Sequence, residues 1–263
     1  MVPDSNNKDV IFYHRAYRKL PSPGLIFSLV EISLLFLFFA VIIFYVFPQL
    51  SSFTSSLSKY ILSFVMPPNT LVISSEKFMS KNFYIIARIG KFPSTTFLFF
   101  TMLATVLAAV LSVKTRKIPK SVGVWIFYVC ILNLLSCLFF LYAPDRFPYD
   151  IKIFSDLYMR TQITVWFFIP LIIPLALSPF PTNVLMKGGI ITLILLYSIV
   201  FGCVRYIVFF YILAKYSYVF MPVLFFALGP LLDFVYIIGL YSFFVSFIAV
   251  KMKGNLTKWQ WSY

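Results

Sequence analysis

The feature that most constrains this chain is a series of long apolar runs that recur from residue 25 to residue 250. A helix needs about 20 consecutive apolar residues to cross the hydrocarbon of a bilayer. The sequence therefore predicts an all-α fold, a polytopic transmembrane helix bundle with six spans. These spans are expected at residues 25–47, 96–113, 122–142, 163–177, 188–214 and 218–250.

The composition leaves no room for a soluble domain beside this bundle. Apolar residues make up 61% of the chain and charged residues only 11%, whereas a soluble domain carries about 25% charged residues. So few ionisable groups could not cover a water-exposed surface. We expect one membrane domain, residues 25–250, between an N-terminal tail (1–24) and a C-terminal tail (251–263).

Two of the expected spans contain helix-breaking residues. Pro170 and Pro174 lie one turn apart in the fourth span, where each removes a backbone hydrogen bond and favours a kink. The last run is too long for one straight span and too short for a helical hairpin. We therefore expect residues 218–250 to form one tilted helix that breaks near Gly229 and Pro230.

Basic residues set the expected orientation, because cytoplasmic loops are enriched in lysine and arginine. The strongest element is the short turn after the second span, which holds Lys114, Arg116, Lys117 and Lys120. This bias places both tails in the cytoplasm. The net charge of +14 is accounted for by basic residues in the tails and loops, which set topology and contact anionic lipid headgroups. No basic stripe with interleaved aromatic residues indicates nucleic-acid binding.

The loop at residues 48–95 is the only sizeable non-spanning region, and it is expected outside and partly at the membrane interface. Tyr60, Ile61, Phe64 and Val65 recur at helical spacing, which suggests a helix lying on the outer headgroups. Residues 71–92 are expected to pack over the helix ends as a lid.

Three charges lie inside the spans, where a charge costs about 2.5 to 3.5 kcal/mol at mid-bilayer and usually faces a partner or a cavity. By depth, Arg205 and Asp233 can pair, whereas Glu31 is expected to reach the interface. The functional interpretation is a polar site of Cys203, Arg205 and Asp233 between the last two helices. The structural interpretation is an ion pair that fixes helix packing.

A second polar face lies on the third span. Cys130, Asn133 and Cys137 are spaced to share one side of a helix, and an asparagine in a span usually bonds a neighbouring helix. Ala104 and Ala108 repeat small residues on the second span. Both patterns are typical of helix packing.

The inventory of reactive side chains argues against several kinds of catalysis. The single histidine, His14, lies in the N-terminal tail, so no histidine-assisted nucleophile and no histidine metal site is expected inside the membrane. The outer carboxylates Asp145, Asp150 and Asp156 match no motif and have basic neighbours, which favours a solvated loop. No cofactor or metal is expected.

Cys203 with Arg205 near the outer end of the fifth span resembles the membrane-embedded cysteine transpeptidases of the exosortase type. The resemblance covers only a few residues. It implies an enzyme that acts on a membrane-anchored peptide. Such an enzyme also needs an arginine and a histidine on later helices. The one helix that follows here supplies neither.

The sequence favours a non-enzymatic subunit or a small transporter-like component of a membrane assembly. Its expected partners are the lipid bilayer and either another membrane protein or further copies of the chain, in the bacterial plasma membrane or an organelle membrane. The alternative is an enzyme that acts on a lipid, a lipid-linked substrate or a membrane-anchored peptide. A wet cavity at Arg205 would favour transport or catalysis, and a dry, paired site would favour the scaffold.

Overall fold

The computed structural model describes residues 17–19, 24–67, 70–115, 119–180, 182–253 and 260–262. Within these ranges six helical segments are long and apolar enough to cross a membrane, which confirms the predicted helix bundle. Five are single helices: α2 (Leu25–Ser63), α3 (Thr95–Lys114), α4 (Lys120–Tyr142), α5 (Ile151–Leu177) and α6 (Val184–Lys215). The sixth segment, Tyr218–Val250, begins with the short helices η4 (Tyr218–Phe220) and η5 (Val223–Ala227) and continues as α7 (Pro230–Lys253).

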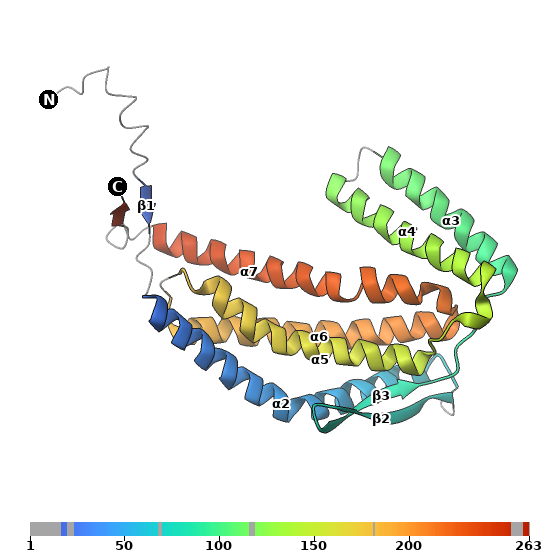
Figure 1. The fold of residues 1–263 in the computed structure, drawn as a ribbon, viewed down its shortest axis with the longest axis horizontal. Helices are drawn as coiled ribbons and strands as arrows, with labels where there is room; N and C mark the ends of the chain where they lie inside the picture. The colour runs from blue at the N-terminus through green and yellow to red at the C-terminus, as the bar shows by residue number, and fades with distance from the viewer. Residues whose placement is uncertain are drawn as a thin grey trace, which may run out of the picture.

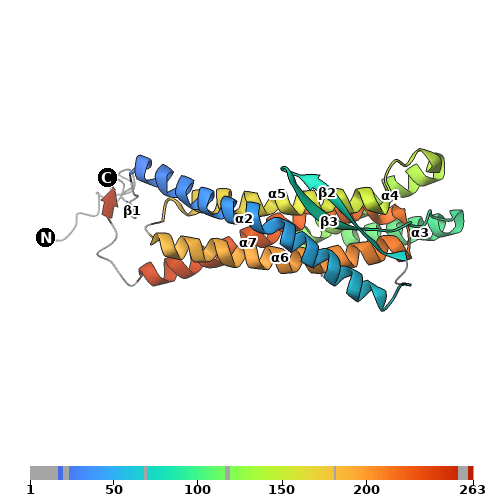
Figure 2. The same ribbon diagram turned by 90° about the horizontal axis from the view of Figure 1, so that it is seen from below.

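The helices form a long bundle with one inclined hairpin. α2, α5, α6 and α7 run along the long axis, while α3 and α4 pair with each other and slope away from α7 (Figure 1). The start of α2 and the end of α7 lie at one end, called here the tail end, where β1 (Tyr17–Lys19) pairs with β4 (Gln260–Ser262) (Figures 1 and 2). Which side of a membrane the tail end faces stays a prediction.

The first helix is longer than the predicted span, because it does not end at Phe47. α2 continues through Pro48 to Ser63. A proline frees the carbonyl one turn before it, and here that carbonyl, on Phe44, accepts a hydrogen bond of 3.0 Å from Lys81 Nζ. The ammonium also lies 4.2 Å from the ring centre of Tyr45. The segment predicted as a separate interfacial helix is thus the second half of α2.

Residues 71–92, predicted to pack over the helix ends as a lid, contain a β-hairpin. β2 (Val72–Phe78) and β3 (Lys81–Ala87) are antiparallel and joined by Met79 and Ser80. β3 packs against α2 and α5, and Phe83, Ile85 and Ile86 are fully buried there. The hairpin therefore covers the sides of these helices at the end opposite the tails.

The fourth span also begins earlier than predicted, because residues 151–162 are helical and belong to α5. Asp150 caps this helix by accepting a 2.6 Å hydrogen bond from the Ile153 amide. Asp156 and Arg160, predicted in a loop, form an ion pair of 2.8 Å along the helix surface. A cap and a pair one turn apart both stabilise helix in a polar sequence.

These extensions imply that the bundle projects beyond the hydrocarbon. α2 has 39 residues, about 58 Å at 1.5 Å per residue, against a hydrocarbon thickness of about 30 Å. The excess lies beside the β-hairpin and the charged first turns of α5. The β-hairpin lies alongside the second half of α2 and the first turns of α5 (Figures 1 and 2).

The last segment breaks where it was predicted to break. A five-residue π-helix, η5, ends at Ala227, and α7 starts at Pro230. A Cβ atom on Gly229 would lie 2.1 Å from the Phe225 carbonyl oxygen, so only glycine fits this close approach of two backbones. The break leaves the carbonyls of Leu228 and Gly229 directed at α6.

Candidate functional site

The centre of the candidate site is Arg205 on α6, whose side chain is only 4% exposed. A guanidinium carries five N–H donors in a rigid plane and has no acceptor. Arg205 Nη1 donates to the carbonyl oxygens of Gly229 at 2.8 Å and Leu228 at 3.3 Å. In an unbroken helix the Leu228 carbonyl would accept from the Leu232 amide, which here donates to the Gly229 carbonyl at 3.1 Å. The break thus frees the Leu228 carbonyl for Arg205.

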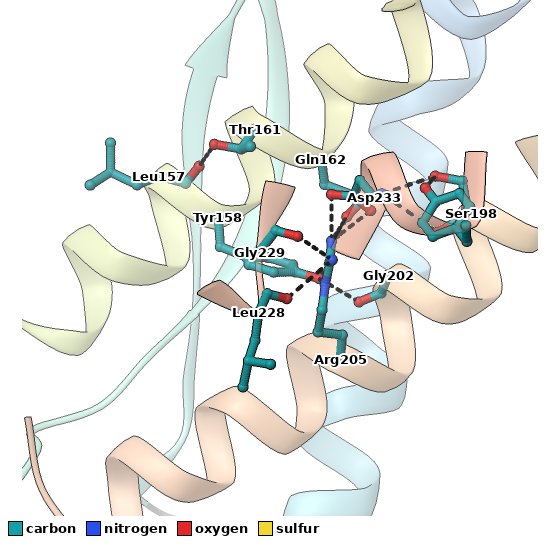
Figure 3. A network of polar contacts seen from close by, with 11 residues as sticks. Leu157, Tyr158, Thr161, Gln162, Ser198, Gly202, Arg205, Leu228, Gly229 and Asp233 are labelled. Carbon is teal, nitrogen blue, oxygen red and sulfur yellow. Dashed lines mark hydrogen bonds and ion pairs between the residues drawn. The ribbon is translucent and has the colours of Figure 1, made fainter. Parts of the chain in front are cut away.

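The other donors of Arg205 reach side chains of α5 and α7 (Figure 3). Nη2 donates to both carboxylate oxygens of Asp233, at 2.9 and 3.0 Å, and to Gln162 Oε1 at 2.7 Å. Nε donates to the Tyr158 hydroxyl at 2.9 Å. The predicted contact between Arg205 and Asp233 is therefore present, and every N–H of the guanidinium has an acceptor.

The network extends away from the ion pair through neutral groups. The Tyr158 hydroxyl donates a hydrogen bond of 2.8 Å to the Gly202 carbonyl, and Gln162 Nε2 donates to Ser198 Oγ at 3.2 Å. Ser198 in turn accepts from the Tyr236 hydroxyl at 2.7 Å. The network thus joins three helices, α5, α6 and α7.

Aromatic rings enclose the guanidinium on two sides. Its carbon lies 5.3 Å from the ring centre of Tyr158 and 5.5 Å from that of Phe201, within the range of cation–π attraction. Asp233 is as buried as Arg205, with 3% of its side chain exposed. The arrangement is that of a buried charge pair whose guanidinium donors all have protein acceptors.

Cys203 does not join this site, contrary to the interpretation that grouped it with Arg205 and Asp233. Two residues apart on a helix, side chains point to nearly opposite faces. Cys203 makes no hydrogen bond to any member of the Arg205 network among the described residues, whereas Arg205 contacts Tyr158 and Gln162 of α5 and Asp233 of α7 (Figure 3). The cysteine and arginine that carry the resemblance to the transpeptidases therefore do not form one site.

The polar face of the third span lies at helix contacts. Cys130 and Cys137 are buried, and Asn133 Nδ2 donates to Thr105 Oγ1 of α3 at 2.7 Å. The hydroxyl of Ser136, one turn from Asn133, donates to the Val219 carbonyl of η4 at 2.7 Å. These residues tie α4 to its neighbours on two sides.

A second buried ion pair lies nearer the tail end, and sequence reasoning missed it. Glu31, expected to reach the interface, instead accepts a 2.9 Å hydrogen bond from Lys187, and the two side chains are 7% and 2% exposed. The pair joins α2 to α6. Lys187 lies just before the fifth span expected from the sequence, which begins at residue 188, and no local pattern indicates a contact across 156 positions.

The described residues contain no cluster of histidine, cysteine, aspartate or glutamate that could hold a metal ion. His14 lies outside them. No protein-family model, curated protein or solved structure matches this chain. A function must therefore be inferred from the residues themselves.

Proposed function

We propose that this multi-pass membrane protein is a non-enzymatic subunit that works through contacts with another membrane protein. The observation that carries the proposal is the saturation of Arg205, whose donors all have protein acceptors in a buried site. A substrate or proton site needs a polar group that is free to change partners. An ion pair whose hydrogen-bonding groups all have protein partners instead fixes the arrangement of the helices that carry it.

The α3–α4 hairpin supplies a surface for such a partner. Its contacts with the rest of the chain are made mainly by α4 with η3 (Pro144–Arg146), η4 and η5, and α3 stands apart from α7 (Figure 1). A groove of about 560 Å³ lies between the hairpin and η4–η5, and Ala104, Ala108 and Asn133 line it. Small residues let a second helix approach closely.

One polar atom beside this groove supports a helix as the occupant. Asn133 Oδ1 is buried and accepts no hydrogen bond from the described part of the chain. A buried acceptor without a donor is costly, by about 1–3 kcal/mol. A serine, threonine or amide side chain on a partner helix would supply the donor after a small rotation of Asn133.

The transporter-like and enzymatic alternatives need water or substrate to reach Arg205. Such access would require opening contacts among α5, α6 and α7 that are closed by hydrogen bonds and by the rings of Tyr158 and Phe201. A transpeptidase would also need Cys203 beside Arg205. Neither alternative gains support from this arrangement.

Purification from the native membrane in a mild detergent tests the proposal through the mass of the native particle. We expect a complex that contains a second polypeptide in fixed ratio. Ala104→Leu should release that polypeptide, because a larger side chain blocks the groove, whereas Val106→Leu, on the exposed opposite face of α3, should retain it. A particle with the mass of one chain would refute the proposal.

A further inference from the structure

The β-hairpin offers two free edges, and its turn fixes which backbone groups lie on each. Met79 and Ser80 have φ angles of 46° and 66°, the signature of a two-residue type I′ turn. Such a turn makes Phe78 and Lys81 a hydrogen-bonded pair, and hydrogen-bonded pairs alternate along the ladder. The outward N–H and C=O groups therefore belong to residues 82, 84 and 86 on β3 and to residues 73, 75 and 77 on β2.

The edge of β3 is covered by helices. Tyr84 accepts from Ser55 Oγ at 2.7 Å and donates to Ser51 Oγ at 3.2 Å, and the Ile86 amide donates to the Tyr206 hydroxyl at 2.9 Å. Tyr206 is also hydrogen-bonded to Ser155 of α5. Side chains of α2 and α6 thus hold the hairpin as a fixed platform.

The edge of β2 is uncovered. No described residue donates to or accepts from the outward backbone groups of Ile73, Ser75 and Lys77, and all three residues are exposed. An open sheet edge does not occur within hydrocarbon, because nothing there can satisfy its polar groups. The edge must therefore face water or headgroups, where a second polypeptide can reach it.

Charge around this edge favours an acidic partner. Lys77 lies on the edge strand with no carboxylate within 4.0 Å in the described part of the chain, and Arg88 is likewise without one at the open end of the hairpin. The nearby Glu76 already forms a 2.9 Å ion pair with Lys152. A groove of about 610 Å³ lies at the open end of the hairpin, where Arg88 and Val72 line it together with Lys152 and Asp150 at the start of α5.

A second copy of the chain does not fit this edge. Two copies in one membrane are related by a twofold axis along the membrane normal, and this operation preserves the direction of a strand along the normal. β2 runs obliquely along the length of the bundle (Figures 1 and 2), so two copies of it cannot become antiparallel. The two β2 strands would instead be parallel and at the same level along the membrane normal. Each outward N–H would then face the same N–H of the other copy, and each C=O the same C=O, so no ladder could form.

We propose that the free edge of β2 binds an extended, acidic segment of a partner polypeptide as an added strand. Added strands bind through main-chain hydrogen bonds, with side chains giving specificity. Residues 73, 75 and 77 supply the main-chain groups, and Lys77 and Arg88 supply the preference for acidic side chains. This inference rests on the proposed role as a partner-binding subunit and assigns it a second contact, outside the hydrocarbon.

The test uses the full chain in detergent and a fluorescein-labelled peptide that alternates valine and threonine with glutamate, followed by fluorescence anisotropy. Ser75→Pro removes an outward N–H that β3 does not use, so the hairpin ladder stays intact. We expect the dissociation constant of the peptide to rise about ten-fold or more. Ser75→Ala keeps the N–H and should bind as the wild type does. Lys77→Glu should also weaken binding, whereas Lys59→Glu, which makes the same change of charge on α2, should not.

Two control peptides separate strand pairing from simple charge attraction. A version with a central proline cannot extend the ladder, and a version with lysine for glutamate has the wrong charge; both should bind weakly. If Ser75→Pro fails to fold, hydrogen exchange of the wild-type protein decides, because the amides of Ser75 and Lys77 should exchange more slowly with peptide bound. Unchanged exchange, or equal binding of the proline peptide, would overturn the proposal.

This outcome is distinguishable from failure of the proposed function. A second polypeptide that co-purifies with the chain and is insensitive to Ser75→Pro would refute the strand edge and leave the subunit role standing. A particle with the mass of one chain would refute the subunit role, whatever the peptide does.

Discussion

Replacing the buried ion pair one residue at a time and then together tests how Arg205 and Asp233 act. Arg205→Met leaves the Asp233 carboxylate, 3% exposed, without its counter-charge. Breaking a buried pair by removing one partner costs about 3 to 5 kcal/mol. A chain of this length loses about 2 to 4 °C in Tm per kcal/mol, so the single variant should melt about 6 to 20 °C below the wild type.

The double variant, Arg205→Met with Asp233→Leu, removes both charges. What remains is the loss of the donors to Gln162 Oε1 and to the Leu228 carbonyl, which the Arg205→Met single variant loses as well. The Gly229 carbonyl still accepts from the Leu232 amide at 3.1 Å. The double variant should therefore melt above the Arg205→Met single variant and below the wild type.

The assay is thermal unfolding of the purified chain in one detergent, with the native mass measured on the same samples. A packing pair permits a double variant that still assembles with its partner, whereas a substrate or proton site gives a folded variant without activity. If the two single losses simply add, the residues are not coupled, and the account of the Arg205 network is refuted.

Two further predictions concern topology and close packing. Reporter fusions after Lys120 and after Lys253 should both report a cytoplasmic location, and a fusion after Asp150 should report an external one. If the fusions after Lys120 and Lys253 lie on opposite sides, the six-span count is wrong. Gly202→Ala should lower Tm, because a Cβ there would lie 2.8 Å from the Gln162 side chain and would displace it from the Arg205 network. Gly239→Ala, which meets no atom within 4 Å, should leave Tm unchanged or raise it, since alanine favours helix by about 1 kcal/mol; equal effects at both sites would contradict the packing described.

Much of the bundle could be predicted from the sequence because hydrocarbon imposes length and hydropathy on every span. The break before Pro230 was also predictable, since a proline cannot continue the hydrogen bonds of the preceding turn. The contact between Arg205 and Asp233 followed from depth alone: each charge needs a partner, and few are available.

The parts that sequence reasoning missed depend on contacts between distant segments. α2 passes through Pro48 because Lys81, far along the chain, satisfies the freed carbonyl. The β-hairpin lacks a turn signal, because Met79 and Ser80 adopt positive φ without the glycine or asparagine that usually marks such a turn.

The partners of Arg205 on α5 show the same limit. Tyr158 and Gln162 read as ordinary loop residues until α5 is seen to begin at Ile151. Asp150 followed by a polar stretch was a signal for a helix cap, and it was missed because the stretch is too polar to be part of a span.

The central claim is that the Arg205 network is dry and structural, and thiol labelling in intact membranes tests it most directly. The three native cysteines are buried and would first be replaced, after which Ser198→Cys reports on the network and Lys215→Cys, on the exposed end of α6, serves as the positive control. A membrane-impermeant maleimide, applied to each side in turn, should label the variant at Lys215 and leave the variant at Ser198 unlabelled. Labelling at Ser198 would reveal a water path to the charged pair and would contradict the scaffold account in favour of transport or catalysis.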